Sequence, residues 1–144
     1  MNDYHIKRFF VAYCLFYERK TIDLKDLPGI LLKFSKYCET NPSLIEQDSE
    51  KVFTAVYKVT GVTKSQITSS SRRPDVAFAR HAVCYFLKEI HGMAGDVIAG
   101  FVNRDRTTVI HSLGVIRDMI EYKEFHTRSY KIISQIEKEI ESYE

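Results

Sequence analysis

The fold is decided by residues 95–116, which read GDVIAGFVNRDRTTVIHSLGVI. Two runs with apolar residues at three- and four-residue steps flank a short polar stretch, and this spacing is typical of two amphipathic helices. The pattern predicts a short helix over 95–101, a tight turn over 102–105 and a longer helix over about 106–120. The longer helix is expected to bury one apolar stripe: Val109, Ile110, Leu113, Ile116 and Ile120.

Two helices joined by a short polar turn form a helix-turn-helix motif. In such a motif the second helix is held from behind by its apolar stripe, while its polar first turn is free to enter the major groove of DNA. Arginine can pair with guanine, threonine methyl groups can contact thymine, and backbone N–H groups at a helix start attract phosphate. The predicted base-reading residues are Asn103, Arg104, Asp105, Arg106, Thr107 and Thr108. A helix-capping turn with solvated arginines is the alternative interpretation of the same residues.

The rest of the chain also shows helical spacing, and no alternating run bounded by turns indicates a strand. Helices are predicted over 4–18, from about residue 26 with Pro28 in the first turn, from 43 to 59 or 60, and over 127–143. The chain is therefore predicted to be all-α. Three parts are expected: an N-terminal helical pair (1–42), a helix-turn-helix domain (43–123) and a C-terminal helix (124–144).

The segment before the motif is expected to contain one more helix. Gly61 should end the preceding helix, residues 62–67 should form a connecting turn, and residues 69–74 a polar loop. Asp75 can then cap a helix that ends at residues 91–92, where histidine is followed by glycine.

This helix is predicted to have one apolar face and a polar remainder. The apolar face is expected to consist of Ala79, Ala82, Val83, Phe86, Leu87 and Ile90. Arg80, His81 and Lys88 are expected to project elsewhere, with Arg80 and Lys88 two turns apart on one face.

The composition is that of an ordinary globular protein. The chain has 144 residues, of which 44% are hydrophobic and 28% charged, enough for one domain with its own core. Cys14, Cys38 and Cys84 form no CxxC pair, which disfavours a zinc ribbon and favours buried thiols in a reducing compartment. The sequence shows no signal peptide and no membrane span, so a cytoplasmic, nucleoid-associated location is expected.

Charge is unevenly distributed along the chain. The net charge is +2, but residues 64–117 carry eight Lys/Arg against four Asp/Glu, whereas residues 118–144 carry four against seven. A basic middle beside an acidic end suggests one surface that faces a polyanion.

The octapeptide Arg104-Asp105-Arg106-Thr107-Thr108-Val109-Ile110-His111 resembles the signature of a known family. This family is the C-terminal DNA-binding domain of the bacterial replication initiator DnaA, an all-α fold of the Trp-repressor-like class. Similarity extends to Ser71-Arg72, to residues 76–82 and to residues 88–90, and it covers roughly residues 45–121. The resemblance implies sequence-specific binding of double-stranded DNA.

The resemblance also implies a role for each matching residue. Arg72 would enter the minor groove from the polar loop, and Arg80 and Lys88 would contact the phosphate backbone. Residues 104–108 would occupy the major-groove reading positions. Arg73 is either a phosphate contact or a solvated loop charge.

Several positions depart from the family pattern. The usual glycine pair is Val102-Asn103, the usual histidine is Arg106, and two basic loop residues are Ser70 and Ser71. These changes imply a related geometry with an altered sequence preference. Because the chain has no GxxxxGK[ST] phosphate loop, an ATPase domain is not expected, and replication control, transcription control and mobile-element maintenance all stay open.

Two other classes of function are considered. An enzyme is disfavoured because His81, His91, His111, Asp96 and Asp105 show no metal-ligand spacing; His111 is expected to be a packed or capping residue, and no catalysis, cofactor or metal is expected. The remaining alternative is a helical protein–protein interaction module. Aromatic residues of 4–18, or the stripe Ile133, Ile136 and Ile140, would then form a homodimer or partner surface, unless they pack onto the chain's own core.

Overall fold

The computed structural model describes residues 25, 28–30, 32 and 44–143. The chain divides into two compact units, residues 1–45 and 46–144. In the first unit, residues 28–30 and residue 32 are helical, which fits the predicted helix from about residue 26. The helix predicted over 4–18, with its aromatic stripe, lies outside the described residues, as do Cys14 and Cys38.

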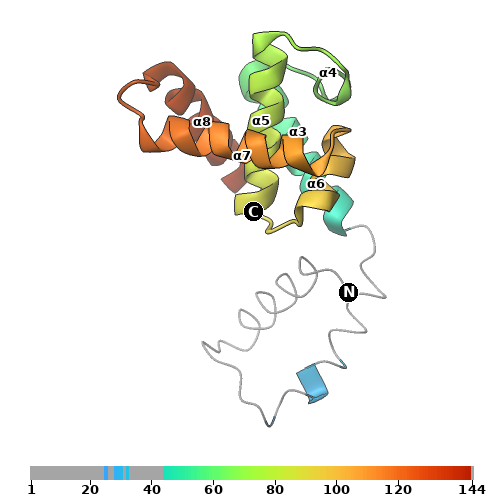
Figure 1. Ribbon diagram of the computed structural model, residues 1–144. Coiled ribbons are helices and arrows are strands. Elements are labelled where there is room, and N and C mark those ends of the chain that lie inside the picture. The colour runs from blue at the N-terminus through green and yellow to red at the C-terminus, as the bar shows by residue number, and fades with distance from the viewer. Residues whose placement is uncertain (1–24, 26–27, 31, 33–43, 144) are drawn as a thin grey trace. The chain divides into compact units, whose positions relative to one another are not determined.

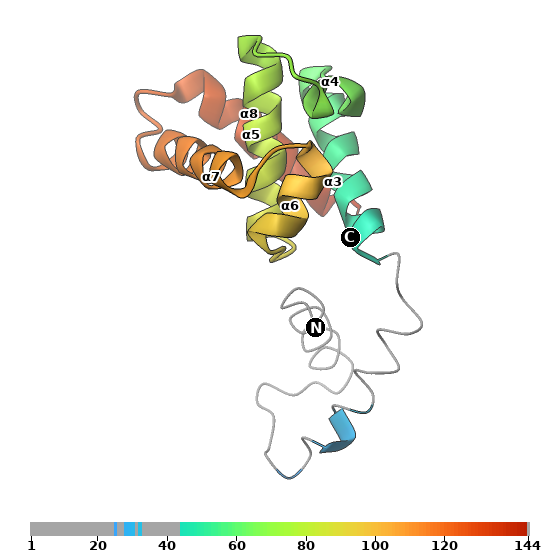
Figure 2. The same ribbon diagram turned by 45° about the vertical axis from the view of Figure 1, so that its right-hand side comes forward.

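The described part of the second unit is all-α, as the sequence predicts. Its helices are α3 (Leu44–Thr60), α4 (Lys64–Thr68), α5 (Pro74–Glu89), α6 (Gly95–Val102), α7 (Arg106–Glu121) and α8 (Thr127–Glu141). Helix α5 packs against α4, α6 and α7, and α7 also contacts α6 and α8. Figures 1 and 2 show α5 at the centre of this unit with α7 lying across it. Of the described helices, none combines the length and apolar character that crossing a membrane would require.

The core is built from one apolar stripe on each long helix. Fully buried side chains include Val52 and Val56 of α3, Val83, Phe86 and Leu87 of α5, Val109 and Ile116 of α7, and Ile133, Ile136 and Ile140 of α8. Burying one such side chain contributes roughly 1.5–3 kcal/mol. The isoleucine stripe of α8 is therefore packed in the core of this chain. This favours the packing interpretation of the stripe over a partner surface.

Helices α3 and α5 both end at a glycine with positive φ. Gly61 has φ +76° and donates its N–H to the carbonyl of Tyr57, which ends α3. Gly92 has φ +61°, and its N–H bonds to Lys88 O while the next N–H, from Met93, bonds to Leu87 O. The bond from the left-handed Gly92 to the carbonyl four residues earlier is that of an αL ending, so α5 ends close to the predicted His91-Gly92 pair.

Two predictions between α3 and α5 are wrong. Residues 62–67 are not only a turn, because α4 begins at Lys64 with a capping box: the Thr63 side chain accepts from Gln66 N–H, and the Gln66 side chain accepts from Thr63 N–H. Asp75 does not cap α5. The cap position is Arg73 and Pro74 takes the first helical position, where its missing N–H costs no hydrogen bond.

Two further corrections concern which side chains are buried. Ile110 was expected in the core of α7, but 59% of its surface is exposed. Arg80 was expected to project away from the core, but only 6% of its surface is exposed. Both residues lie beside the predicted site, so both change how the site is built.

Candidate nucleic-acid interface

The turn between α6 and α7 depends on a left-handed residue, Asn103, with φ 56° and ψ 48°. Its N–H and that of Arg104 both donate to the carbonyl of Ala99, the latter at 3.0 Å, and this closes the end of α6. Asparagine is one of the few non-glycine residues that adopt this conformation readily. Asn103 therefore supplies the turn geometry that a glycine would otherwise give.

Asp105 is the N-cap of α7. Its Oδ1 accepts a hydrogen bond from the Thr108 N–H at 2.7 Å, and hydrogen bonds from the Thr108 backbone and side chain hold the pKa of the Asp105 carboxyl below its usual range. Asp105 and Thr108 were both predicted to read bases. In the structure they are hydrogen-bonded to each other. For these two residues the geometry is that of a helix cap.

The outward side of α7 is a continuous exposed face. We name it the α7 face and define it by Arg106, Thr107, Ile110, His111, Gly114 and Arg117. The members recur at steps of three and four residues, so they share one side of the helix. A β-carbon added at Gly114 would meet no atom within 4 Å, so the backbone itself is accessible there. Sequence reasoning missed Ile110, His111 and Gly114, although their spacing from Arg106 and Thr107 could have indicated them.

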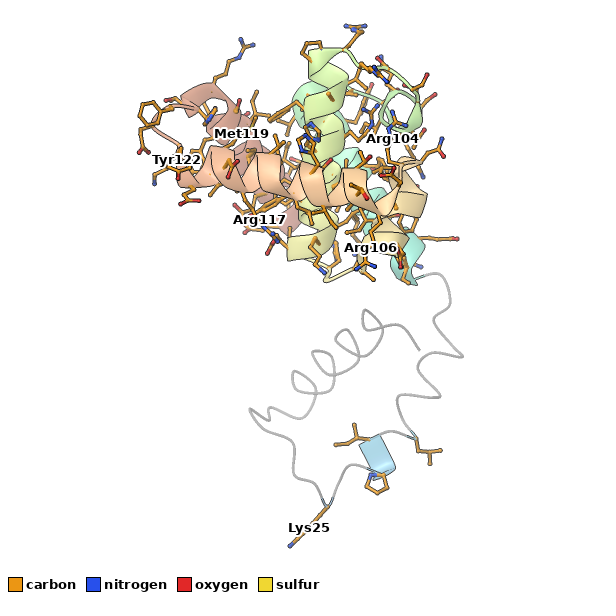
Figure 3. The ribbon with its side chains drawn as sticks, viewed as in Figure 1. Lys25, Arg104, Arg106, Arg117, Met119 and Tyr122 are labelled. Carbon is orange, nitrogen blue, oxygen red and sulfur yellow. The ribbon has the colours of Figure 1, made fainter. Side chains whose placement is uncertain are left out.

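The two arginines of the turn point in different directions. Figure 3 shows Arg104 directed toward α4 and Arg106 directed toward the turn that precedes α6. The Arg106 side chain lies along Gly95, where a β-carbon would come within 3.5 Å of Arg106 Cγ. Arg106 is exposed on the α7 face, whereas Arg104 is half-buried.

Three side chains hold the backbone at the end of α4 and in the loop between α4 and α5. Arg80 Nε donates to Ile67 O at 2.8 Å, and Arg80 Nη2 donates to Ser69 O and Ser71 O, each at 3.1 Å. Arg104 Nη2 donates to Ser69 O at 2.6 Å, and Asn103 Nδ2 donates to Thr68 O at 3.3 Å. We call these three side chains, Arg80, Asn103 and Arg104, the carbonyl clamp. Burial, and then the nearby charge of Arg104, lower the pKa of the Arg80 guanidinium.

The remaining predicted site residues lie at the two ends of α5. Arg72 and Arg73 are exposed in the loop before its first turn, and Arg73 forms an exposed ion pair with Asp75 at 3.1 Å. Lys88 is half-buried in the last turn of α5. The structure thus brings Arg80, Asn103 and Arg104 together with the Arg72 loop, but it does not place Lys88 in that cluster.

A polar contact joins α5 to the inner side of α7. His81 Nδ1 lies 2.8 Å from Ser112 Oγ, and the His81 ring meets the His111 ring edge-on with centroids 5.9 Å apart. Burial lowers the pKa of His81, and His111 and Arg80 lower it further. His111 was expected to be a packed or capping residue; it is exposed, with one side of its ring against His81.

Two kinds of reactive site are not found among the described residues: an activated thiol and a cluster of metal-ligating side chains. Burial raises the pKa of the Cys84 thiol to about 11, so this cysteine is protonated at neutral pH. No three His, Cys, Asp or Glu side chains among the described residues converge to hold a metal ion.

Helices α6 and α7, with a three-residue turn and an exposed outer face on α7, define a helix-turn-helix domain. Residues 49–116, from α3 to the core of α7, match the family described as the bacterial DnaA protein helix-turn-helix. A relative is the chromosomal replication initiator protein DnaA of Kosmotoga olearia. It is 29% identical over 84 residues, which are 58% of this chain and 18% of that relative. The chain thus spans less than a fifth of the relative's length. No solved structure matches this chain.

Proposed function

We propose that the domain of residues 43–123 binds double-stranded DNA in a sequence-specific manner, with α7 in the major groove. The observation that carries this proposal is the α7 face, an uninterrupted exposed side of a helix whose opposite side is fixed by Val109, Leu113 and Ile116. An α-helix with its side chains is roughly 10–12 Å across, and the major groove is about 12 Å wide. The helix-turn-helix family of residues 49–116 supports the same function.

The α7 face carries the side-chain types that base reading requires. Arg106 can donate to guanine, and Thr107 can bond to a base edge or contact a thymine methyl group. Ile110, with most of its surface exposed, adds an apolar contact of the kind that thymine methyl groups accept. Gly114 would allow the helix backbone to approach the duplex closely.

Phosphate contacts are assigned away from the first turn of α7. Asp105 already places a carboxylate on the N–H of Thr108, so a phosphate at this helix start would meet a negative charge. The exposed arginines of the α4–α5 loop, Arg72 and Arg73, are therefore the main candidates, with Arg72 at the minor groove. Lys88 remains a proposed phosphate contact at the other end of α5.

Affinity for a pool of random duplexes, measured by fluorescence anisotropy at several salt concentrations, tests the proposal. Each neutralised phosphate contributes a slope of about −0.9 to log affinity against log salt. Arg72→Ala should weaken binding to every duplex and reduce the slope by about one, whereas Thr107→Ala should change which duplexes are selected. Arg128→Ala, which removes an exposed arginine on α8, is the matched control and should leave affinity unchanged.

Two results would overturn the proposal. The first is a chain that ignores duplexes at low salt, which would favour a protein-interaction module instead. The second is equal weakening by Arg72→Ala and Arg128→Ala, which would indicate attraction by net charge without a site.

We further propose a cytoplasmic, nucleoid-associated location, with replication control, transcription control and mobile-element maintenance as the processes to test.

A further inference from the structure

We infer that the carbonyl clamp is a positioning device: Arg80, Asn103 and Arg104 fix the α4–α5 loop to the helix-turn-helix turn, so that Arg72 and the α7 face engage one duplex as a single rigid unit. This inference rests on the proposed function, which it deepens. It assigns Arg80 and Arg104 to the loop, in place of the phosphate and base contacts expected from the sequence.

The clamp joins segments that are distant in the sequence. Arg80 on α5 reaches back 13, 11 and 9 residues to the carbonyls of Ile67, Ser69 and Ser71. Asn103 and Arg104 each reach back 35 residues, to Thr68 and Ser69. Four carbonyls within residues 67–71, two at the end of α4 and two in the loop, are thereby bonded to side chains from α5 and from the turn between α6 and α7. The loop is held at the point where it leaves α4, directly before Arg72.

The donors of Arg80 show why this residue is assigned to the loop. A guanidinium has five N–H groups, and the edge formed by Nε and one terminal nitrogen binds phosphate bidentately. In Arg80 all three N–H groups of the Nε–Nη2 edge are directed at loop carbonyls, and the residue is 6% exposed. One phosphate-binding edge of Arg80 is thereby occupied, and burial limits access to the rest of the guanidinium.

Arg104 is committed in a similar way. Its Nη1 donates to Asn103 O at 3.0 Å and its Nη2 to Ser69 O at 2.6 Å, so the guanidinium bridges the turn and the loop. Figure 3 shows this side chain directed toward α4, away from Arg106. Arg104 therefore joins the two halves of the interface, while Arg106 remains on the α7 face.

A fixed loop changes the energetics of binding. An arginine on a mobile loop loses conformational freedom when it enters a groove, and this loss weakens its contribution to affinity. A loop that is held before binding loses less. The contribution of Arg72 should therefore depend on Arg104, although Arg104 itself contacts no DNA in this arrangement.

A double-mutant cycle with the full chain tests this dependence. Arg72→Ala should weaken duplex affinity about tenfold in the parent, but no more than about threefold when Arg104→Ala is already present. Arg104→Lys should restore part of the loss, because lysine can donate to Ser69 O but cannot bridge to Asn103 O as well. In the control cycle, Arg104→Ala is combined with Lys88→Ala at the other end of α5, and the fold losses of affinity from the two substitutions should multiply. If the fold losses from Arg72→Ala and Arg104→Ala also multiply, the positioning role is refuted.

Limited trypsin digestion tests the clamp without DNA. Trypsin can cut between Arg72 and Arg73, whereas the bond after Arg73 is followed by Pro74 and resists cleavage. Arg104→Ala should speed this cut several-fold while cleavage after Arg128 on α8 keeps its parental rate. Unchanged cleavage at Arg72 would contradict the clamp. If the cut accelerates but the parent binds no duplex, the loop is clamped and the proposed function alone fails.

Discussion

Arg80 and Arg104 donate hydrogen bonds to the same acceptor, the carbonyl oxygen of Ser69, at 3.1 and 2.6 Å. Two guanidinium groups from different elements thus meet at one point of the loop, and burial, followed by the charge of Arg104, lowers the pKa of Arg80. Their mutual repulsion is offset by further carbonyl dipoles, those of Ile67 and Ser71 for Arg80 and that of Asn103 for Arg104. The stability of the loop therefore depends on both arginines.

Replacement of Arg80 should destabilise the whole domain. Arg80→Met keeps much of the side-chain volume but leaves the carbonyls of Ile67 and Ser71 without their side-chain donor, while Ser69 O keeps Arg104. The expected cost is roughly 3 kcal/mol in the free energy of unfolding. Urea unfolding followed by circular dichroism measures this cost. Arg72→Met, an exposed loop arginine eight residues earlier, is the matched control and should change stability by less than about 0.5 kcal/mol. Equal and small effects of both changes would show that the bonds of Arg80 add little to stability.

Truncation of Ile110 should alter base preference without altering the fold. Because 59% of its surface is exposed, Ile110→Ala should cost little stability. It should lower discrimination between thymine and other bases at one position of the selected site by roughly 1–3 kcal/mol. Selection of duplexes from a random pool, followed by sequencing, measures the preference. Phe125→Ala, which truncates a side chain that is 80% exposed in the α7–α8 turn, should leave the selected sequence unchanged. An identical site for Ile110→Ala would remove Ile110 from the interface.

Substitution of Gly114 should affect stability and binding in opposite directions. Glycine inside a helix costs about 1 kcal/mol relative to alanine, and the space beside Gly114 is open, so Gly114→Leu should raise the free energy of unfolding by several tenths of a kcal/mol or more. The same side chain would stand between the helix backbone and the duplex, so affinity should fall at least tenfold. Thermal unfolding and anisotropy on one preparation measure both quantities. A stabilised variant with parental affinity would show that α7 does not approach DNA at this point.

The lowered pKa of His81 should make the free energy of unfolding decrease in mild acid. Because the pKa of His81 is lowered from 6.5 in the folded protein, the unfolded chain binds the proton more tightly. The contribution of the neutral ring is therefore complete above about pH 6.5 and is lost as the pH falls from there toward the folded pKa. The free energy of unfolding should decrease over this range in the parent, and decrease less in His81→Gln. His126→Gln, at an exposed histidine before α8, should keep the parental slope. An unchanged slope in His81→Gln would contradict this account.

The sequence predicts the helix-turn-helix well because its signals are local. The bounds of α6 and α7 and the burial of Val109, Leu113 and Ile116 follow from three- and four-residue spacing. Ile110 was placed in the core as a member of this stripe, three residues before Leu113. It follows Val109 by one residue and so lies about 100° around the helix, on the exposed side.

The carbonyl clamp is beyond what such patterns can show. An arginine on a helix normally lies in solvent. Arg80 can be buried because carbonyls 9 to 13 residues earlier in the chain accept hydrogen bonds from its guanidinium. The bond from Arg104 to Ser69 spans 35 residues, and no periodicity encodes it. By contrast, the capping box of Thr63 and Gln66 was visible in the sequence and would have predicted α4.

The central claim is that the α7 face and the Arg72 loop together contact duplex DNA. The most direct measurement is NMR titration of the labelled chain with a duplex obtained by selection, following backbone amide shifts along the whole chain. We expect the largest changes at residues 106–114 and 70–73, with little change at residues 122–126. Changes confined to residues 122–126 or to α8, with 106–114 unaffected, would contradict it.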